Sequence, residues 1–238
     1  MARERFAGKI GCWRVKNPIR PTVRGVSCYV SLQNPAAFVE IPAEVAVMPL
    51  PGATLLPNAL LPLFIFEPRY RMMLAEALRT DRVFCVAQSL PGVEEVREDR
   101  DIEAVAGLGL VRACVGHPDG TSHLILQGMT RVRIHEFVRR KPYRVARVEA
   151  LPSRLGEAAV EEELRLQLVA VCGRIRESGV RLPPVIERTL EAPIALDTLA
   201  DLVAGSFVLD PVVRQRLLEE TEVAARTRLL LAALRRGE

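Results

Sequence analysis

The sequence predicts an α+β protein in which a β-rich half precedes a helical half. Short apolar runs separated by proline and glycine turns fill residues 44–152, a pattern typical of strands. After residue 156 the apolar residues instead recur with the 3.6-residue period of helices. We therefore expect a basic, disordered N-terminal arm at 1–43, a β-rich domain at 44–152 and a helical bundle at 157–238.

The arm concentrates positive charge. Residues 1–40 hold seven basic and two acidic side chains, whereas residues 41–238 hold 26 basic and 27 acidic ones. The arm is compatible with a flexible extension, a transit-like segment or a non-native stretch that precedes a later translation start. Because phosphate binding needs clustered positive charge, only the arm favours nucleic acid as a partner.

Six strands are expected in the β half. Pro57 and Pro62 mark the second strand as an edge or bent strand, because proline cannot donate to a sheet ladder. The turn Pro118-Asp119-Gly120 predicts a hairpin between two longer strands. The expected strands are Val45–Leu50, Ala59–Phe66, Val83–Leu90, 102–115, 122–137 and Tyr143–Leu151.

One early helix interrupts these strands. Glu67-Pro68 is a favourable helix start, since proline at the first helical position loses no hydrogen bond. An apolar face at helical spacing follows, formed by Tyr70, Met73, Leu74, Ala77 and Leu78. Six strands with one helix predict a small, partly closed barrel or a sandwich.

Five helices are expected in the second half. Val160, Leu164, Leu168, Val171 and Ile175 define one face of a helix that ends near Glu177. Short connectors separate four further helices, which are expected at about 184–191, 198–204, 211–220 and 222–236. Helices with short connectors predict a bundle.

Composition narrows the class of protein. No apolar run reaches the roughly 20 residues that a membrane-spanning helix needs, and the N-terminus lacks the apolar core of a secretory signal. The five cysteines form no C-x-x-C pair and fit neither a disulfide framework nor a four-thiolate zinc site. We expect a cytoplasmic protein with reduced thiols, no membrane contact and no cofactor.

Candidate reactive groups do not form a convincing catalytic or metal site. His117, Asp119 and His123 flank the hairpin turn, but a metal needs further ligands. Cys85 and Cys114 lie within apolar runs, where a thiol stays protonated and inert. We therefore expect no catalytic residue and no metal ligand.

Several blocks resemble the N-terminal domain of Lon protease. They are Val47–Gly52, Leu61–Tyr70 with its Phe-Glu-Pro-Arg-Tyr sequence, Gly107–Val111, Leu126–Ile134 and Pro142–Val148, followed by Leu199–Ala204 and Gln215–Glu219 in the helical half. The resemblance covers about residues 44–236. It implies a PUA-like pseudo-barrel with an appended helical bundle.

The resemblance also implies a function. In Lon this region recognises substrate proteins and helps the enzyme assemble. The phosphate-binding G-x-x-x-x-G-K-[ST] motif does not occur in this sequence, and Lon's Ser–Lys dyad belongs to a domain without a counterpart here. The chain is therefore identified as a stand-alone member of the Lon substrate-binding domain family and is expected not to be an enzyme.

Two sets of residues are candidates for binding a partner. The proline-interrupted second strand offers an apolar edge that can receive an unfolded segment by strand addition, through Pro57, Leu60, Pro62, Phe64 and Phe66. Arg131 and Arg133 alternate with apolar residues, so they are expected on one outer face, where they could grip an acidic partner. Glu67, Pro68, Arg69 and Tyr70 are interpreted as a structural lock between helix and barrel.

The leading hypothesis is a non-catalytic module that binds exposed hydrophobic polypeptide segments without ATP. It would act as an adaptor for an ATP-dependent protease or as a holdase. Either role is compatible with a homo-oligomer. The alternative is an RNA-binding PUA-like module that uses the basic arm. A third hypothesis, a small-molecule site between barrel and bundle, has no support among the residues.

Overall fold

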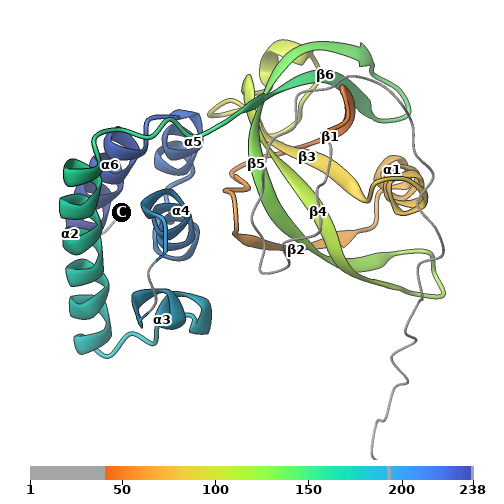
Figure 1. Ribbon diagram of the computed structural model, residues 1–238. Coiled ribbons are helices and arrows are strands. Elements are labelled where there is room, and N and C mark those ends of the chain that lie inside the picture. Colours follow the sequence, from red (N-terminus) through yellow and green to blue (C-terminus); the bar gives the residue numbers. More distant parts are fainter. Residues whose placement is uncertain (1–40, 192–193, 237–238) are drawn as a thin grey trace, which may run out of the picture.

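The computed structural model describes residues 41–191 and 194–236. A β-rich half and a helical half lie side by side and are joined by one extended connection (Figure 1). The α+β prediction is therefore confirmed. The arm predicted at 1–43 lies outside the described residues apart from its last three.

Five strands close into a barrel. Pairing runs in the order β5, β4, β3, β1 and β6, and β6 pairs back onto β5. Only β1 and β3 are parallel, and the other pairs are antiparallel. The barrel alternative of the sequence analysis is thus correct. The strands are β1 (Glu44–Leu50), β2 (Leu60–Ile65), β3 (Val83–Gln88), β4 (Val105–Gly116), β5 (Ser122–Arg139) and β6 (Arg144–Leu151).

The strand β2 lies outside this closed ring. Among the described residues it pairs with β5 alone, so its second edge has no strand partner. The long strand β5 makes this possible, because its first half pairs with β2 and its second half with β6. The prediction that β2 is an edge strand is confirmed.

Glycines let the loop before β2 lie against the barrel. A Cβ atom added to Gly107 would come within 1.9 Å of the carbonyl oxygen of Leu55, and one added to Gly128 within 2.0 Å of that of Leu56. Any side chain at either position would therefore collide with backbone. This close approach buries Thr54, Leu55 and Leu56.

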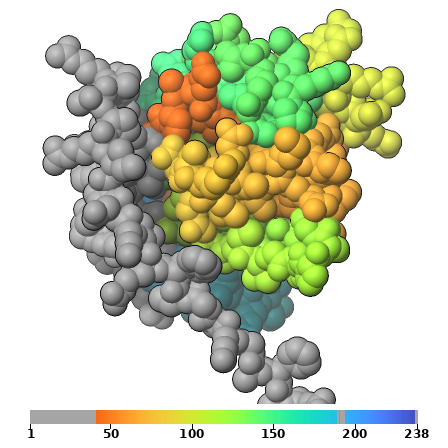
Figure 2. All heavy atoms as spheres, turned by 90° about the vertical axis from the view of Figure 1, so that its right-hand side faces the viewer, coloured from red at the N-terminus to blue at the C-terminus, as the bar shows by residue number. Residues whose placement is uncertain are grey.

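The helix α1 (Pro68–Arg79) packs across the barrel. Its buried residues Tyr70, Met73, Leu74 and Ala77 match the expected apolar face, but Leu78 stays 38% exposed. Figure 2 shows α1, in orange, above the light-green tip of the β4–β5 hairpin. Apart from the residues packed against α1, the barrel holds an apolar cluster that includes Val47, Cys85 and Leu108 and joins the strands to one another.

The helical half is a bundle whose core includes Leu168, Leu199 and Leu230 and extends to Leu56 and Val105 of the β half. Asp210 caps α5, because its carboxylate accepts hydrogen bonds from the backbone N–H groups of Val212 and Val213. In the described part of the chain, no helix combines the length and the apolar character needed to cross a membrane. The helices are α2 (Ala158–Glu177), α3 (Pro184–Glu191), α4 (Leu196–Phe207), α5 (Pro211–Glu219) and α6 (Val223–Arg236); a single 3₁₀ turn, η1 (Asp99–Asp101), precedes β4.

Candidate functional site

An apolar stripe lies on the outer face of β2 and continues just past its end. Leu60 is 63% exposed, Phe64 49% and Phe66 59%, and Pro62 between them is exposed too. The alternation follows from strand geometry, since every second side chain points to the same face, while Ile65 points inward and is buried. Exposed aromatic groups in such a row are typical of an interaction surface.

The stripe borders a shallow hollow on the same face of the sheet. The hollow has a volume of about 380 Å³. Among the described residues, its lining includes no Asp, Glu, Lys or Arg side chain. The hollow is therefore suited to apolar groups. Its lining comes from three neighbouring strands: Pro62, Leu63 and Phe64 of β2, Ala113, Cys114 and Val115 of β4, and His123, Leu124 and Ile125 of β5.

Among the described residues, the backbone groups on the free edge of β2 have no strand partner. The carbonyl oxygen of Ala59 accepts a hydrogen bond from the N–H of Gly128 on β5, so the odd-numbered residues of this segment face β5. Pro62, which has no N–H to donate, then faces the free edge, where proline is tolerated. The backbone groups of Leu60 and Phe64 share this edge and are available to another extended chain.

Two histidines lie at one end of the hollow. The Nε2 atom of His117 and the Nδ1 atom of His123 are 2.7 Å apart, a hydrogen-bonding distance. The ring of His123 lies 4.6 Å from that of Phe64, which in turn stacks on Phe66 at 5.9 Å between centroids. A row of four rings therefore runs from the hairpin tip to the end of β2.

Pro57 does not belong to this surface. The sequence analysis placed it on the apolar edge, but the structure buries it. The reason is the close packing of the preceding loop on Gly128, whose added Cβ would come within 3.2 Å of the Cα of Pro57. The exposed stripe begins only at Leu60.

Arg131 is also placed differently from the prediction. It was expected beside Arg133 on an outer face, yet it is only 2% exposed, whereas Arg133 is exposed. Its Nη1 and Nη2 atoms lie 2.9 and 2.5 Å from the two carboxylate oxygens of Asp201 on α4. Its Nε also donates to the carbonyl oxygen of Leu218. Arg131 therefore joins barrel to bundle, and its burial keeps its guanidinium away from a partner.

The same carboxylate serves a second buried arginine. The Nε atom of Arg226 on α6 lies 3.4 Å from Asp201, and its other nitrogens donate to the carbonyl oxygen of Glu220 and the hydroxyl of Ser153. Burial lowers the pKa of Arg226, although the charge of Asp201 opposes this. One carboxylate thus pairs with two guanidinium groups at the junction of the two halves.

The Glu67–Tyr70 block lies at the start of α1. Glu67 occupies the N-cap position without a side-chain capping bond, and its carboxylate pairs with Arg69 at 2.7 Å. The guanidinium of Arg69 lies over the ring of Tyr70 at 4.6 Å. Tyr70 is buried against the barrel, which raises the pKa of its hydroxyl. Pro68 is exposed at the first helical position.

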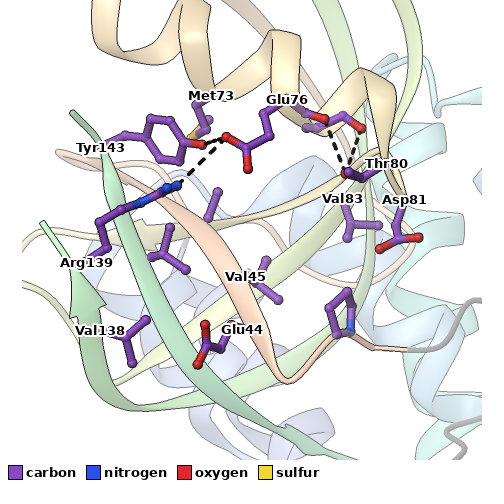
Figure 3. A pocket seen from close by; sticks show the side chains of 14 residues that line it. Glu44, Val45, Met73, Glu76, Thr80, Asp81, Val83, Val138, Arg139 and Tyr143 are labelled. Carbon is purple, nitrogen blue, oxygen red and sulfur yellow. Dashed lines mark hydrogen bonds and ion pairs between the residues drawn. The ribbon is translucent and has the colours of Figure 1, made fainter. Parts of the chain in front are cut away.

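A second hollow, of about 480 Å³, lies between α1 and the strands β1 and β6 (Figure 3). Its polar groups pair with one another: the hydroxyl of Tyr143 donates to Glu76, and the guanidinium of Arg139 lies over the Tyr143 ring and 4.0 Å from Glu76. Burial and the neighbouring carboxylate raise the pKa of Tyr143. This hollow therefore offers less apolar surface than the one beside β2.

The buried thiols are poor nucleophiles. Cys85 is 0% exposed, and burial raises the pKa of its thiol to about 12. Cys172 in the bundle core has a pKa raised to about 11 for the same reason. Both groups remain protonated at neutral pH, and a thiol rather than a thiolate does not attack.

The sequence analysis missed the residues that neighbouring strands add to the site. Val115 lies opposite His123, and Ile125 lies opposite Pro62, so these side chains share the face of the exposed stripe. Counting outward from the Pro118-Asp119-Gly120 turn would have paired Val115 with His123. The pairing of β2 with β5 is not visible in the sequence, because Leu63 and its partner Leu124 stand 61 positions apart in the chain.

Comparison with solved structures identifies the fold as that of Lon N-terminal domains. The N-terminal domain of the Mycobacterium avium complex Lon protease matches with a TM-score of 0.62 at 19% identity, over 81% of this chain and 98% of that chain. A Lon N-terminal domain protein from Xanthomonas campestris matches with a TM-score of 0.58 at 24% identity, over 79% and 97%. The class is therefore a β-barrel domain of Lon type with its appended helices.

Residues 44–236 match the model of the ATP-dependent protease La (LON) substrate-binding domain. The chain belongs to this family. It is 28% identical over 198 residues to the Lon protease of Anaeromyxobacter dehalogenans and 30% identical over 193 residues to Lon protease 2 of Herpetosiphon aurantiacus. These matches cover 83% and 80% of this chain but only 24% and 23% of the relatives.

Proposed function

We propose that this chain is a non-catalytic module that binds exposed hydrophobic segments of other polypeptides. The observation that carries the proposal is the apolar stripe of Leu60, Pro62, Phe64 and Phe66 beside an unpaired strand edge. An extended segment pairs with that edge through its backbone and places alternate side chains in the hollow. Membership of a substrate-binding family supports a polypeptide as the ligand.

Charge also favours an apolar partner. Within the described chain, the lining of the hollow carries no ordinarily charged side chain, so binding an uncharged segment requires no ion there to lose its water. Backbone pairing makes little demand on sequence, while the Phe64 and Phe66 rings select apolar side chains. Such a site binds many unfolded clients with moderate affinity, as an adaptor or a holdase does.

The test measures binding of a permanently unfolded model protein, reduced and carboxymethylated lactalbumin, by isothermal titration. The expected result is micromolar affinity without ATP. Phe64→Ser and Leu60→Ser are expected to weaken binding by about tenfold or more, as loss of a central apolar contact does. Leu166→Ser is the matched control, because Leu166 is a similarly exposed leucine, 56% accessible, on α2 of the bundle.

Two results would count against the proposal. If the unfolded protein produces no heat at any accessible concentration, the chain is not a polypeptide binder of this kind. If Leu166→Ser weakens binding as much as Leu60→Ser does, the affinity comes from general surface hydrophobicity rather than from the β2 face.

The cellular partner is part of the same proposal. An ATP-dependent protease is the candidate if the module is an adaptor, and a pull-down from the native cell with a Phe64→Ser control would recover it from the wild-type chain alone. Recovery of unrelated misfolded proteins would instead indicate a holdase.

We also propose a cytoplasmic location, which the free thiols of Cys85, Cys114 and Cys172 support. The RNA-binding alternative depends on the basic arm, which lies outside the described residues.

A further inference from the structure

The histidine pair at the end of the hollow has a chemical property that the surrounding apolar residues lack. Histidine is the side chain whose charge ordinarily changes between about pH 5 and 8. His117 follows β4 and His123 lies on β5, so the hairpin turn between them brings their facing nitrogens to 2.7 Å. Their rings meet edge to face at 5.0 Å between centroids.

The hydrogen bond between the rings depends on how many protons the pair holds. In the neutral pair one nitrogen donates and the other accepts. One added proton leaves a donor and an acceptor in place and strengthens the bond by charge. A second proton turns both facing nitrogens into donors, so the bond is lost and the rings repel. Full protonation therefore breaks the contact between the two rings.

Charged groups lie near the pair on the hairpin side. Asp119 in the turn accepts hydrogen bonds from the hydroxyl and the N–H of Thr121, which lower the pKa of its carboxyl, and so it stays ionised. Arg71 of α1 lies close to Gly120 in the same turn. Among the described lining residues of the hollow, the titratable group on β4 is Cys114. On β2 the ring of Phe64 faces His123, and Phe66, Glu67 and Arg69 lie beyond the strand end.

His123 is thus the lining group of the hollow that can acquire a charge in the physiological range. Its ring lies against Phe64, so a segment bound over Phe64 also covers this imidazole. Covering an imidazole with apolar groups removes its water and disfavours the charged form. The neutral pair and a bound apolar segment therefore stabilise each other.

We propose that the His117–His123 pair is a proton-operated release device for the β2 site: proton uptake by the pair expels the bound hydrophobic segment. The inference rests on the proposed function and adds its regulation. The direction in which affinity changes with pH follows from the linkage between proton uptake and binding. Binding favours the deprotonated pair, so affinity is full at pH 8 and falls as the pH drops through the range in which the free pair takes up its proton.

The test measures the affinity of the full chain for a hydrophobic peptide from pH 8 to pH 5.5. The peptide has capped ends and contains no histidine, aspartate, glutamate, lysine or cysteine, so its own charge stays constant. A chelator keeps trace metal off the imidazoles. The wild-type dissociation constant is expected to rise about tenfold over this range, because proton uptake by the pair opposes binding.

Three variants test whether the histidine pair causes the pH dependence of binding. His123→Gln keeps a polar neutral side chain and is expected to flatten the pH dependence, whatever its affinity at pH 8. His117→Gln is expected to reduce the dependence. His135→Gln is the control, because His135 pairs with Glu149 at 3.0 Å further along β5, away from the hollow, and its loss should leave the dependence intact.

The outcomes separate this inference from the function on which it rests. Binding at pH 8 with no change at pH 5.5, or the same pH dependence in His123→Gln as in the wild type, would overturn the release device and leave the binding site standing. Absence of binding at pH 8 would overturn the proposed function and the device together.

Discussion

The junction between barrel and bundle and the outer face of β2 distribute charge in opposite ways. The junction buries Arg131, Asp201 and Arg226, each at most 3% exposed, whereas the outer face exposes Leu60, Phe64 and Phe66. In most proteins charged side chains are exposed and large apolar side chains are buried. The buried charges are paired with one another. On the outer face Phe64 and Phe66 stack on each other yet stay about half exposed, and the second edge of β2 has no strand partner among the described residues. The difference separates a surface that holds the molecule together from one that is free to bind.

The largest expected effect is at the junction. Asp201→Ala leaves two buried guanidinium groups without their carboxylate, and breaking a buried ion pair in this way costs about 3–5 kcal/mol. The free energy of unfolding, measured by urea denaturation, should fall by that amount. Arg133→Ala is the matched surface control and should change it by less than about 0.5 kcal/mol. Equal effects of the two substitutions would show that the junction is not held by these charges.

A smaller effect is expected where the loop before β2 meets the barrel. Gly128→Ala places a Cβ atom against the carbonyl oxygen of Leu56, so the loop must shift away. Overpacking of this kind costs about 1–3 kcal/mol. Thermal unfolding measures the change, and Gly173→Ala on α2, where an added Cβ meets nothing within 4 Å, serves as the control. A neutral Gly128→Ala would contradict the close approach.

The smallest effect on stability is expected at the outer face itself. Phe64→Ser removes an exposed ring and should change the free energy of unfolding by no more than about 0.5 kcal/mol, while it weakens binding. Urea denaturation checks the first half of this prediction. A loss of several kcal/mol would mean that Phe64 holds the barrel together and that the comparison between the two regions is wrong.

Local signals in the sequence were enough to predict most of the fold. The Pro118-Asp119-Gly120 turn specifies the β4–β5 hairpin, and Asp210-Pro211 specifies the start of α5, because each acts on neighbouring backbone. Four of the five residues assigned to the apolar edge of β2 are exposed, namely Leu60, Pro62, Phe64 and Phe66. These features need no information from distant parts of the chain.

The errors came from partners far away in the sequence. Arg131 alternates with apolar residues like Arg133, and only the arrival of Asp201 from α4, 70 residues later, distinguishes them. Pro57 is buried because Gly128 permits close packing of its loop. The proposed role of His123 depends on the pairing of β2 with β5, which brings Phe64 opposite it. No local pattern carries this information.

Hydrogen–deuterium exchange of β2 tests the central claim most directly. The amide groups of Leu60 and Phe64 face the free edge and should exchange readily in the unliganded chain. Addition of the unfolded model protein at saturating concentration should slow their exchange, because a bound segment pairs with this edge. Protection confined to the helical bundle, with β2 amides unchanged while the ligand is bound, would contradict the account.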